Sequence, residues 1–114
     1  MLLDPLSERL CQYMSLLSMR QQLVASNIAN ADTPGYKTQD IDVENEFQNV
    51  MEGLQPMTGE VKGLTVKNDG NNVDLDREAR LLAENAMRFS IAGNLVKGQL
   101  KELKMAIDGG GSSS

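Results

Sequence analysis

The sequence predicts a mainly α-helical protein with a long helix toward each end and an irregular linker between them, in which there is room for a short β-hairpin. Apolar residues recur at steps of three and four over residues 5–30 and again over residues 74–108, as they do on one face of a helix. Residues 37–73 lose that period and collect Gly, Asn and Asp, which favour turns. We therefore divide the chain into an N-terminal helix and turn (1–36), an extended linker region (37–73), a C-terminal helix (74–108) and a flexible tail (109–114).

The first helix has a clear start, because Asp4 can cap it and Pro5 lacks the N–H that a first turn would leave unpaired. One apolar stripe follows and is interrupted once, around Arg20 and Gln21. We expect this stripe to be the packing face of the helix, through Leu6, Leu10, Tyr13, Leu17, Val24 and Ile28.

The second helix follows Asp74, a candidate N-cap, and carries a heptad seam that continues as far as Ile107. Small residues at Ala79, Ala86 and Gly93 form one column of the seam and would let a partner helix approach closely. The packing residues that we predict on this helix are Leu82, Ala86, Phe89, Gly93, Val96, Leu100 and Leu103.

Both helices carry further apolar residues off these stripes, namely Leu16, Met19 and Leu23 on the first and Met87, Ile91 and Leu95 on the second. Scattered apolar residues are normal on the surface of a monomer. A second buried face in an assembly is the other interpretation, and we favour it because two helices cover only one face of each other.

The linker contains "IDVENEFQNVMEG", which fits either a short helix or an irregular acidic segment, and "EVKGLTVKNDGNNVDL", which suggests a small strand pair. The alternating acids Asp40, Asp42, Glu44 and Glu46 are expected to be solvated surface, because nothing apolar encloses them. The run "KNDGNNVDLDRE" is rich in side-chain oxygens but does not fit a calcium-binding loop. Such a loop has Gly at its sixth position and acids or amides at the first and third, and placing Gly70 at the sixth puts Thr65 at the first and Lys67 at the third. We interpret it as a turn followed by a helix cap, formed by Asn68, Asp69, Gly70, Asn71, Asn72 and Asp74.

The composition argues against catalysis and against several kinds of partner. The chain has no histidine and a single cysteine, Cys11, so the commonest general base and zinc ligand are missing, and we expect no enzyme, no metal and no cofactor. The net charge is −5 and no cluster of Lys and Arg exists beyond Lys97, Lys101 and Lys104, which argues against a nucleic-acid partner. The sequence contains no run of about eighteen apolar residues, so we expect no direct membrane insertion, and no cleavable secretion signal is visible.

The stretch "SNIANADTPGY" ends the first helix with more specification than a helix stop needs. Pro34 pushes the residue before it out of helical geometry, and Gly35 accepts the positive φ of a turn. Asn27 and Asn30 lie on one helix face and can bind the backbone of the turn or of a neighbouring chain. The candidate turn and assembly motif is Asn27, Asn30, Asp32, Thr33, Pro34, Gly35 and Tyr36.

"SNIANADTPGYK" within a helical N-terminus resembles the signature of the axial proteins of the bacterial flagellum, the rod and hook family. "NDGNNVDLDREARLLAEN", followed by a long helix, is similar to the B-type proximal-rod subfamily in particular. The two motifs and their helices cover about two thirds of the chain. The chain differs from the longest members of the family because it has no large inserted domain between the helices, which suits a short rod subunit.

The resemblance implies a structural subunit of the proximal rod, in which the two terminal helices pair as a coiled coil and self-assemble by helix packing into a tubular drive shaft around the export channel. Implied partners are copies of itself, other rod proteins, proteins of the MS-ring/rod junction and the flagellar type III export apparatus. The implied location is the periplasmic rod of the basal body, after type III export.

From the residues alone, two other functions stay open. A soluble helical adaptor or export chaperone would bind one partner through the same apolar faces and stop at a small oligomer, whereas a rod subunit would form filaments at high concentration. A metal-responsive binding module would change its circular dichroism or melting temperature when calcium is added.

Overall fold

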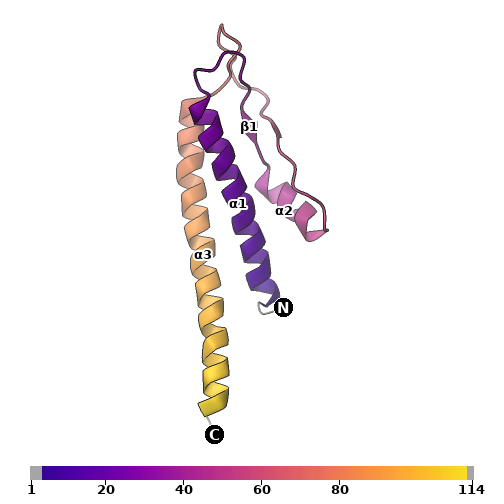
Figure 1. Ribbon diagram of the computed structural model, residues 1–114, viewed down its shortest axis with the longest axis vertical. Coiled ribbons are helices and arrows are strands. Elements are labelled where there is room, and N and C mark those ends of the chain that lie inside the picture. The colour runs from indigo at the N-terminus through magenta and orange to yellow at the C-terminus, as the bar shows by residue number, and fades with distance from the viewer. Residues whose placement is uncertain (1–3, 113–114) are drawn as a thin grey trace.

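The computed structural model describes residues 4–112, and its mainly helical fold confirms the predicted class. The elements are α1 (Pro5–Ala29), β1 (Gln39–Asp40), α2 (Val43–Met51), β2 (Gly59–Glu60) and α3 (Leu75–Ser112). Figure 1 shows α1 and α3 side by side and antiparallel, with α2 and the strands on the other side of α1. The molecule is elongated, with extents of 73 × 27 × 17 Å.

Both long helices begin at the capping residues that the sequence predicts. The side chain of Asp4 accepts a hydrogen bond from the Ser7 N–H (2.7 Å), and Pro5 occupies the first helical position. At the start of α3, the side chain of Asp74 accepts hydrogen bonds from the N–H groups of Asp76 (3.0 Å) and Arg77 (3.2 Å). These carboxylates satisfy N–H groups that have no partner within their helices.

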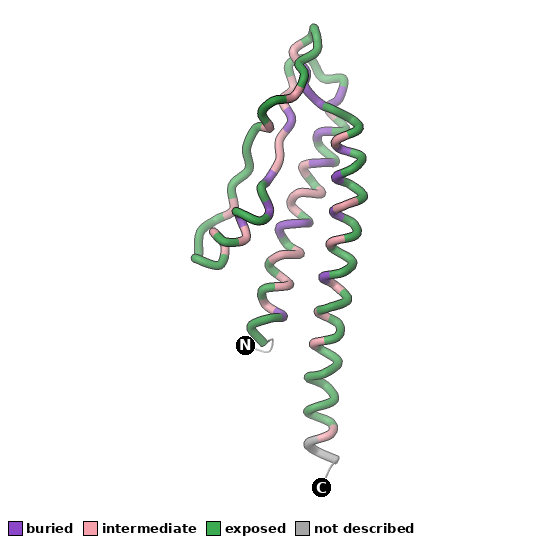
Figure 2. The backbone as a smooth tube through the Cα atoms, turned by 180° about the vertical axis from the view of Figure 1, so that it is seen from behind, coloured by how far each residue is buried: buried purple, intermediate pink, exposed green. Residues whose placement is uncertain are grey.

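α3 ends at Ser112 rather than at the predicted residue 108, so part of the predicted tail is helical. Glycine is a poor helix former, but unlike proline it keeps its N–H and can continue a helix that is already formed. Residues 113–114 of the predicted tail lie outside the described residues. Figure 2 shows that α3 continues beyond the start of α1 and is mostly exposed there.

The apolar core lies between α1 and α2, which is the helix that "IDVENEFQNVMEG" forms. Leu16, Leu17, Ile41 and Val43 are its buried residues, and Tyr13, Met19, Leu23, Phe47 and Val50 pack around them. The second apolar face of α1 is therefore covered within the same chain, and the prediction that an assembly covers it was wrong for this helix. The linker supplies the cover because α2 is itself amphipathic.

The small sheet closes the linker around α2. β1 and β2 are antiparallel, with Gln39 opposite Glu60 and Asp40 opposite Gly59. The two strands therefore lie before and after α2 and do not form a hairpin around Val61. The apolar residues Val61, Leu64 and Val66 are spaced by three and then two positions, whereas a strand with one apolar face needs a spacing of two throughout.

The face of α3 that lies against α1 is not the predicted heptad seam. Its buried residues are Glu78, Leu81, Asn85 and Ala92, each one position before a seam residue. One position is about 100° around a helix, so the seam lies to one side of the contact. The large seam residues Leu75, Leu82, Phe89, Leu100, Leu103 and Ile107 are between 39% and 67% exposed.

On α1, the predicted stripe is buried only in part. Leu17 and Val24 are buried, Leu10 and Tyr13 are half-buried, and Leu6 and Ile28 are exposed. Hydrogen bonds account for the rotation of α3, because the Asn85 side chain donates to the Leu17 carbonyl (2.8 Å) and to Gln21 Oε1 (3.2 Å). A buried amide that lost such partners would be costly, so these polar contacts decide which face of α3 meets α1.

Candidate functional site

The two motif stretches of the sequence meet where α1 ends and α3 begins, at the top of Figure 1. The Tyr36 N–H donates to the Thr33 carbonyl (3.2 Å), and Gly35 has a φ of +76°. A positive φ at the third residue is what a type II turn requires. The Gly35 N–H donates to the carbonyl of Asp69 (2.9 Å) and so joins this turn to the second motif.

The backbones of the two stretches touch at a pair of glycines. Gly70 has a φ of +88°, and a Cβ added there would lie 3.3 Å from the Cα of Gly35. Two lysines hold the contact from its sides: the Lys67 ammonium donates to the Ala31 carbonyl (3.1 Å), and the Lys37 ammonium donates to the Gly70 carbonyl. Only glycine combines this φ with so close an approach.

The paired asparagines of the second motif connect it to the first by their side chains. The amide of Asn71, which is fully buried, donates to the carbonyls of Asn30 and Thr33 (both 2.8 Å). The Asn72 Oδ1 accepts hydrogen bonds from the Thr38 N–H (2.7 Å) and the Thr38 hydroxyl (2.9 Å). The run that resembled a metal loop therefore binds the backbone that follows α1.

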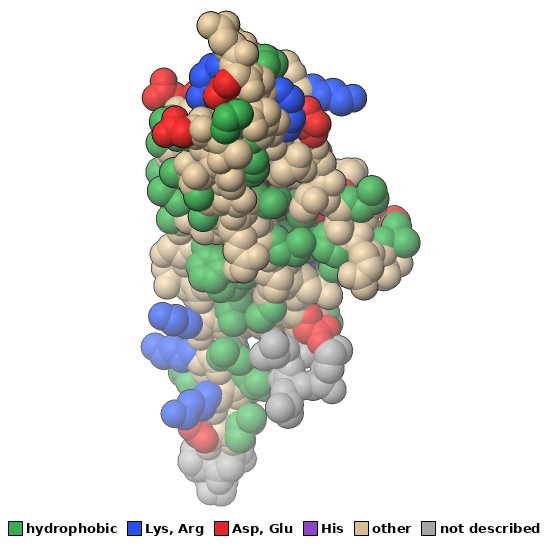
Figure 3. Space-filling model, turned by 45° about the horizontal axis from the view of Figure 1, so that its top comes forward, with side chains coloured by type: hydrophobic (Ala, Val, Ile, Leu, Met, Phe, Trp, Pro, Cys, Tyr) green, Lys and Arg blue, Asp and Glu red, His purple; other side chains and the backbone are tan. Residues whose placement is uncertain are grey.

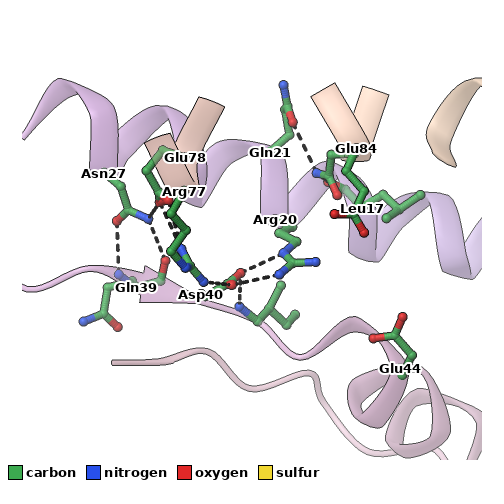
Figure 4. A network of polar contacts seen from close by, with 12 residues as sticks. Leu17, Arg20, Gln21, Asn27, Gln39, Asp40, Glu44, Arg77, Glu78 and Glu84 are labelled. Atoms are coloured by element: carbon green, nitrogen blue, oxygen red, sulfur yellow. Dashed lines mark hydrogen bonds and ion pairs between the residues drawn. The ribbon is translucent and has the colours of Figure 1, made fainter. Parts of the chain in front are cut away.

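Asn27 is fully buried and makes four hydrogen bonds, of which Figure 4 shows those with Gln39 and Glu78. Its Nδ2 donates to the Gln39 carbonyl (2.8 Å) and to the Glu78 carboxylate. Its Oδ1 accepts from the Gln39 N–H (3.1 Å) and from the Tyr36 hydroxyl (2.8 Å). One side chain on α1 thus fixes the turn, β1 and the first turn of α3 together.

The other predicted motif residues have smaller roles in this chain. Asn30 is half-buried; its Nδ2 donates to the Ser26 carbonyl (2.8 Å), and its Oδ1 accepts from the Thr33 hydroxyl (3.0 Å). Pro34 is exposed at the corner. Asp32 and Asn68 are also exposed, and neither side chain makes a hydrogen bond to another described residue.

A cluster of four charges, which the sequence analysis missed, lies next to Asn27. Arg20 of α1 makes two hydrogen bonds to Asp40 of β1, both 2.9 Å. Arg77 of α3 also binds Asp40, and its Nη1 lies 2.9 Å from an oxygen of Glu78, which is fully buried. Figure 4 shows Arg20 and Arg77 converging on Asp40 from the two helices.

The electrostatics of this cluster favour the charged form of Asp40. Burial acts to raise the pKa of its carboxyl group, but hydrogen bonds from Arg20, from the Ile41 N–H (2.7 Å) and from Arg77 act in the opposite direction. The net result is a pKa below the ordinary value for Asp. The pKa of Arg20 is raised in turn, because the hydrogen bond and charge of Asp40 outweigh the burial of the guanidinium.

The prediction that the linker acids are solvated surface was wrong for two of the four. Asp40 lies in the charge cluster, and Glu46 is buried and accepts a hydrogen bond from the Met57 N–H (2.8 Å). Asp42 and Glu44 are exposed, as expected. Arg20 was the sequence signal that could have revealed the role of Asp40. It is a charged residue within the apolar stripe of α1, and an arginine that becomes covered on such a face needs an acidic partner.

The polar side chains of this site serve mainly to join α1, β1 and α3. No group of three or more His, Cys, Asp and Glu in the described part of the chain could hold a metal ion, and Cys11 is a free, half-buried thiol. Nor is any helix of residues 4–112 long and apolar enough to cross a membrane. The arrangement instead produces a rigid corner between two helices.

Comparison with known proteins gives a consistent result. A family model described as flagella basal body rod protein matches residues 14–37, which end in the turn motif. The flagellar basal body rod protein FlgB of Escherichia coli K12 is 31% identical over 122 residues, covering 85% of this chain and 88% of that protein. FlgB of Salmonella typhimurium LT2 is 32% identical over 123 residues, with the same coverage. FlgB of Borrelia hermsii is 30% identical over 122 residues, covering 84% of this chain and 90% of that protein.

Proposed function

We infer the function of this chain from one premise: it belongs to the FlgB family of flagellar basal body rod proteins. It is a structural subunit of the bacterial flagellar basal-body rod. We propose further that it belongs to the proximal rod and self-assembles by helix packing into a tubular drive shaft around the export channel. On this proposal it catalyses no reaction.

One observation supports the assembly proposal most strongly, namely that the large residues of the α3 seam are exposed, except for the half-buried Val96, because α1 packs mainly on a different face of the helix. Figure 3 shows apolar side chains gathered along one face of the helix pair. Covering the exposed half of each of the six large seam residues would contribute about 1 kcal/mol per residue. A neighbouring helix along the seam is therefore favoured by roughly 6 kcal/mol of apolar burial, repeated in every subunit.

The seam also has a place for a neighbour to enter. A groove of about 320 Å³ lies beside the contact of α1 and α3 and is lined by Leu17, Ser18, Gln21, Asn85, Ala86 and Phe89. Its lining combines apolar and polar side chains, as does a surface that packs against another protein. Because Ala86 is small and exposed, a side chain from a neighbour can approach the helix there.

We propose copies of this chain and other rod proteins as partners, with proteins of the MS-ring/rod junction and the type III export apparatus as further contacts. Family membership supports the first two, and the implied position in the periplasmic rod supports the others. A second candidate function, an adaptor or export chaperone, would use the same exposed seam. Analytical sedimentation over rising concentration separates the two, because filaments support the rod subunit and a fixed small oligomer supports the chaperone.

The experiment that tests the assembly proposal is complementation in the bacterium that carries this gene, after the gene has been deleted. Ala86→Leu should abolish swimming, because overpacking a close helix contact costs about 1 to 3 kcal/mol at every interface. Gly93→Leu should do the same, although a Cβ there lies 3.5 Å from Met14 Cε and the change also presses on α1. Ala79→Leu, at the start of the helix, is the milder control. Wild-type swimming with Ala86→Leu would show that the seam faces solvent in the rod.

A further inference from the structure

Two arginines on α3 connect that helix to the linker across α1. Among the described residues, no Cα of α2 or of either strand lies within 8 Å of a Cα of α3. The core that holds the linker consists of residues from α1 and the linker alone. The linker is therefore held relative to α3 indirectly, through α1, which packs on both, and directly by the side chains of α3 that reach it.

The first connection is buried. Arg77 reaches Asp40 of β1, where Arg20 of α1 also binds, so that residues of three elements meet at one carboxylate. All three side chains are less than one fifth exposed, with relative exposures of 18% for Arg20, 15% for Arg77 and 13% for Asp40.

The second connection is on the surface. The Nη1 of Arg88 donates to the Tyr13 hydroxyl of α1 (3.2 Å) and to Glu44 of α2 (3.1 Å). Tyr13 in turn packs edge to face on Phe47 of α2, with ring centroids 5.9 Å apart. Arg88 thus binds one residue of α1 and one residue of the linker. Arg77 likewise binds the linker at a carboxylate that an α1 residue, Arg20, also binds.

The spacing of the two connections gives them a common effect. Arg77 and Arg88 are eleven residues apart on α3, or about 16 Å along the helix axis, whereas their partners Asp40 and Glu44 are four residues apart in the linker. A body attached at one point can still swing, and attachment at a second point stops the swing. Buried ion pairs of this kind often contribute little to stability and more to a single defined geometry.

We propose that Arg77 and Arg88 are positioning residues that fix the direction of the linker segment, residues 37–61, relative to α3, and that this direction is required for assembly. The second half of this inference rests on the proposed function as a rod subunit. In an assembly of repeated contacts, a subunit whose outer segment can swing presents a different surface to each neighbour. Losing both arginines should therefore harm assembly without unfolding the chain.

The test is the double variant Arg77→Met with Arg88→Met. Methionine keeps an apolar stem in place of each arginine stem and removes only the charged group. Asp40 retains both hydrogen bonds from Arg20, and Glu44 is 71% exposed. The buried Glu78 loses its only cationic partner and retains the hydrogen bond from Asn27, so the helix content of the double variant is compared with that of the wild type before any distance is interpreted. Arg80→Met is the matched control, because Arg80 is an exposed arginine of the same helix.

The readout is the distribution of distances between spin labels at Gln48→Cys on α2 and Asn94→Cys on α3, in a full-length Cys11→Ser background. All variants are measured at one concentration at which circular dichroism gives equal helix content. We expect the double variant to give a distribution about twice as wide as that of the wild type, because the linker then samples an ensemble of directions. Arg88→Met alone should give an intermediate width, and Arg80→Met the wild-type width.

In cells, the double variant should be secreted normally but yield few completed basal bodies, whereas Arg80→Met should yield normal numbers. An unchanged distance distribution in the double variant would overturn the positioning role. A wide distribution with normal numbers of basal bodies would overturn the requirement for assembly. In both cases complementation by the wild-type chain would be unaffected, so that failure of this inference is distinct from failure of the proposed function.

Discussion

Replacing Asn27 with leucine should destabilise the chain far more than the same change at Asn30. The leucine side chain branches at the same carbon but is larger, so at this fully buried position the variant removes the hydrogen bonds and also strains the packing. It leaves three groups without their Asn27 partner, namely the N–H and the carbonyl of Gln39 and one oxygen of the buried Glu78. The Tyr36 hydroxyl, by contrast, still lies 3.4 Å from Ser26 Oγ.

The magnitude follows from these losses. A buried polar group left without a partner costs about 1 to 3 kcal/mol. The two Gln39 groups are such cases, whereas the Glu78 oxygen keeps Arg77, so we expect a loss of about 2 to 6 kcal/mol from the free energy of unfolding, out of a typical 5 to 15 kcal/mol. Asn30→Leu should cost less than about 1 kcal/mol, because its partners are a carbonyl already bonded within α1 and an exposed hydroxyl.

The assay is urea unfolding of both variants and the wild type, followed by far-ultraviolet circular dichroism at one chain concentration high enough for full helix content. In cells, both variants should still be secreted, since the expected defect is in docking, but Asn27→Leu should give few completed basal bodies. Unfolding free energies of the two variants within about 0.5 kcal/mol of each other would refute the reasoning, because that is the usual range of a neutral surface change.

Three further predictions follow from the same structure. At low concentration the free chain should be only partly helical and should gain helix as concentration rises, because its apolar seam needs a partner; a cooperative melt of a fully helical chain that is independent of concentration would contradict this. Because the folded pKa of Asp40 is lowered, its contribution to stability is complete above the ordinary Asp pKa of about 3.9 and is lost as pH falls through the folded value, so acid titration should destabilise the wild type more than Asp40→Asn. Gly35→Val should cost about 1 to 3 kcal/mol through its positive φ alone, since nothing lies within 4 Å of the added Cβ; Gly59→Val, with equal space and no positive φ, should be nearly neutral in the same unfolding assay.

Those features that depend on neighbours in sequence were predictable. Asp4 and Pro5 mark the start of α1, Asp74 caps α3, and the Pro34-Gly35 corner predicts the positive φ that the turn has. Each of these signals acts within about four residues, where backbone geometry and capping decide the conformation. The bounds of α1 and the start of α3 follow from them and from the apolar period, whereas the end of α3 does not.

The rotation of α3 was not predictable in this way, because it depends on hydrogen bonds that join residues far apart in the chain. Asn85 binds a carbonyl 68 residues earlier, and Glu78 binds Asn27, 51 residues earlier. A polar residue within an apolar helix pattern is ordinarily assigned to solvent, and only knowledge of its distant partner reverses that assignment. The same holds for Asp40, whose arginine partners lie 20 and 37 residues away.

The heptad seam of α3 is the strongest apolar pattern in the sequence, yet most of its residues are exposed rather than buried against α1. On α3, Glu78 and Asn85 bind α1 and favour this rotation of the helix, in which their hydrogen bonds are satisfied. That rotation leaves the large seam residues Leu75, Leu82, Phe89, Leu100, Leu103 and Ile107 exposed. An apolar contact with α1 could have competed with the contact to a neighbour for the same residues. Because the contact with α1 uses Glu78, Leu81, Asn85 and Ala92 instead, most large residues of the seam stay exposed and are free for assembly.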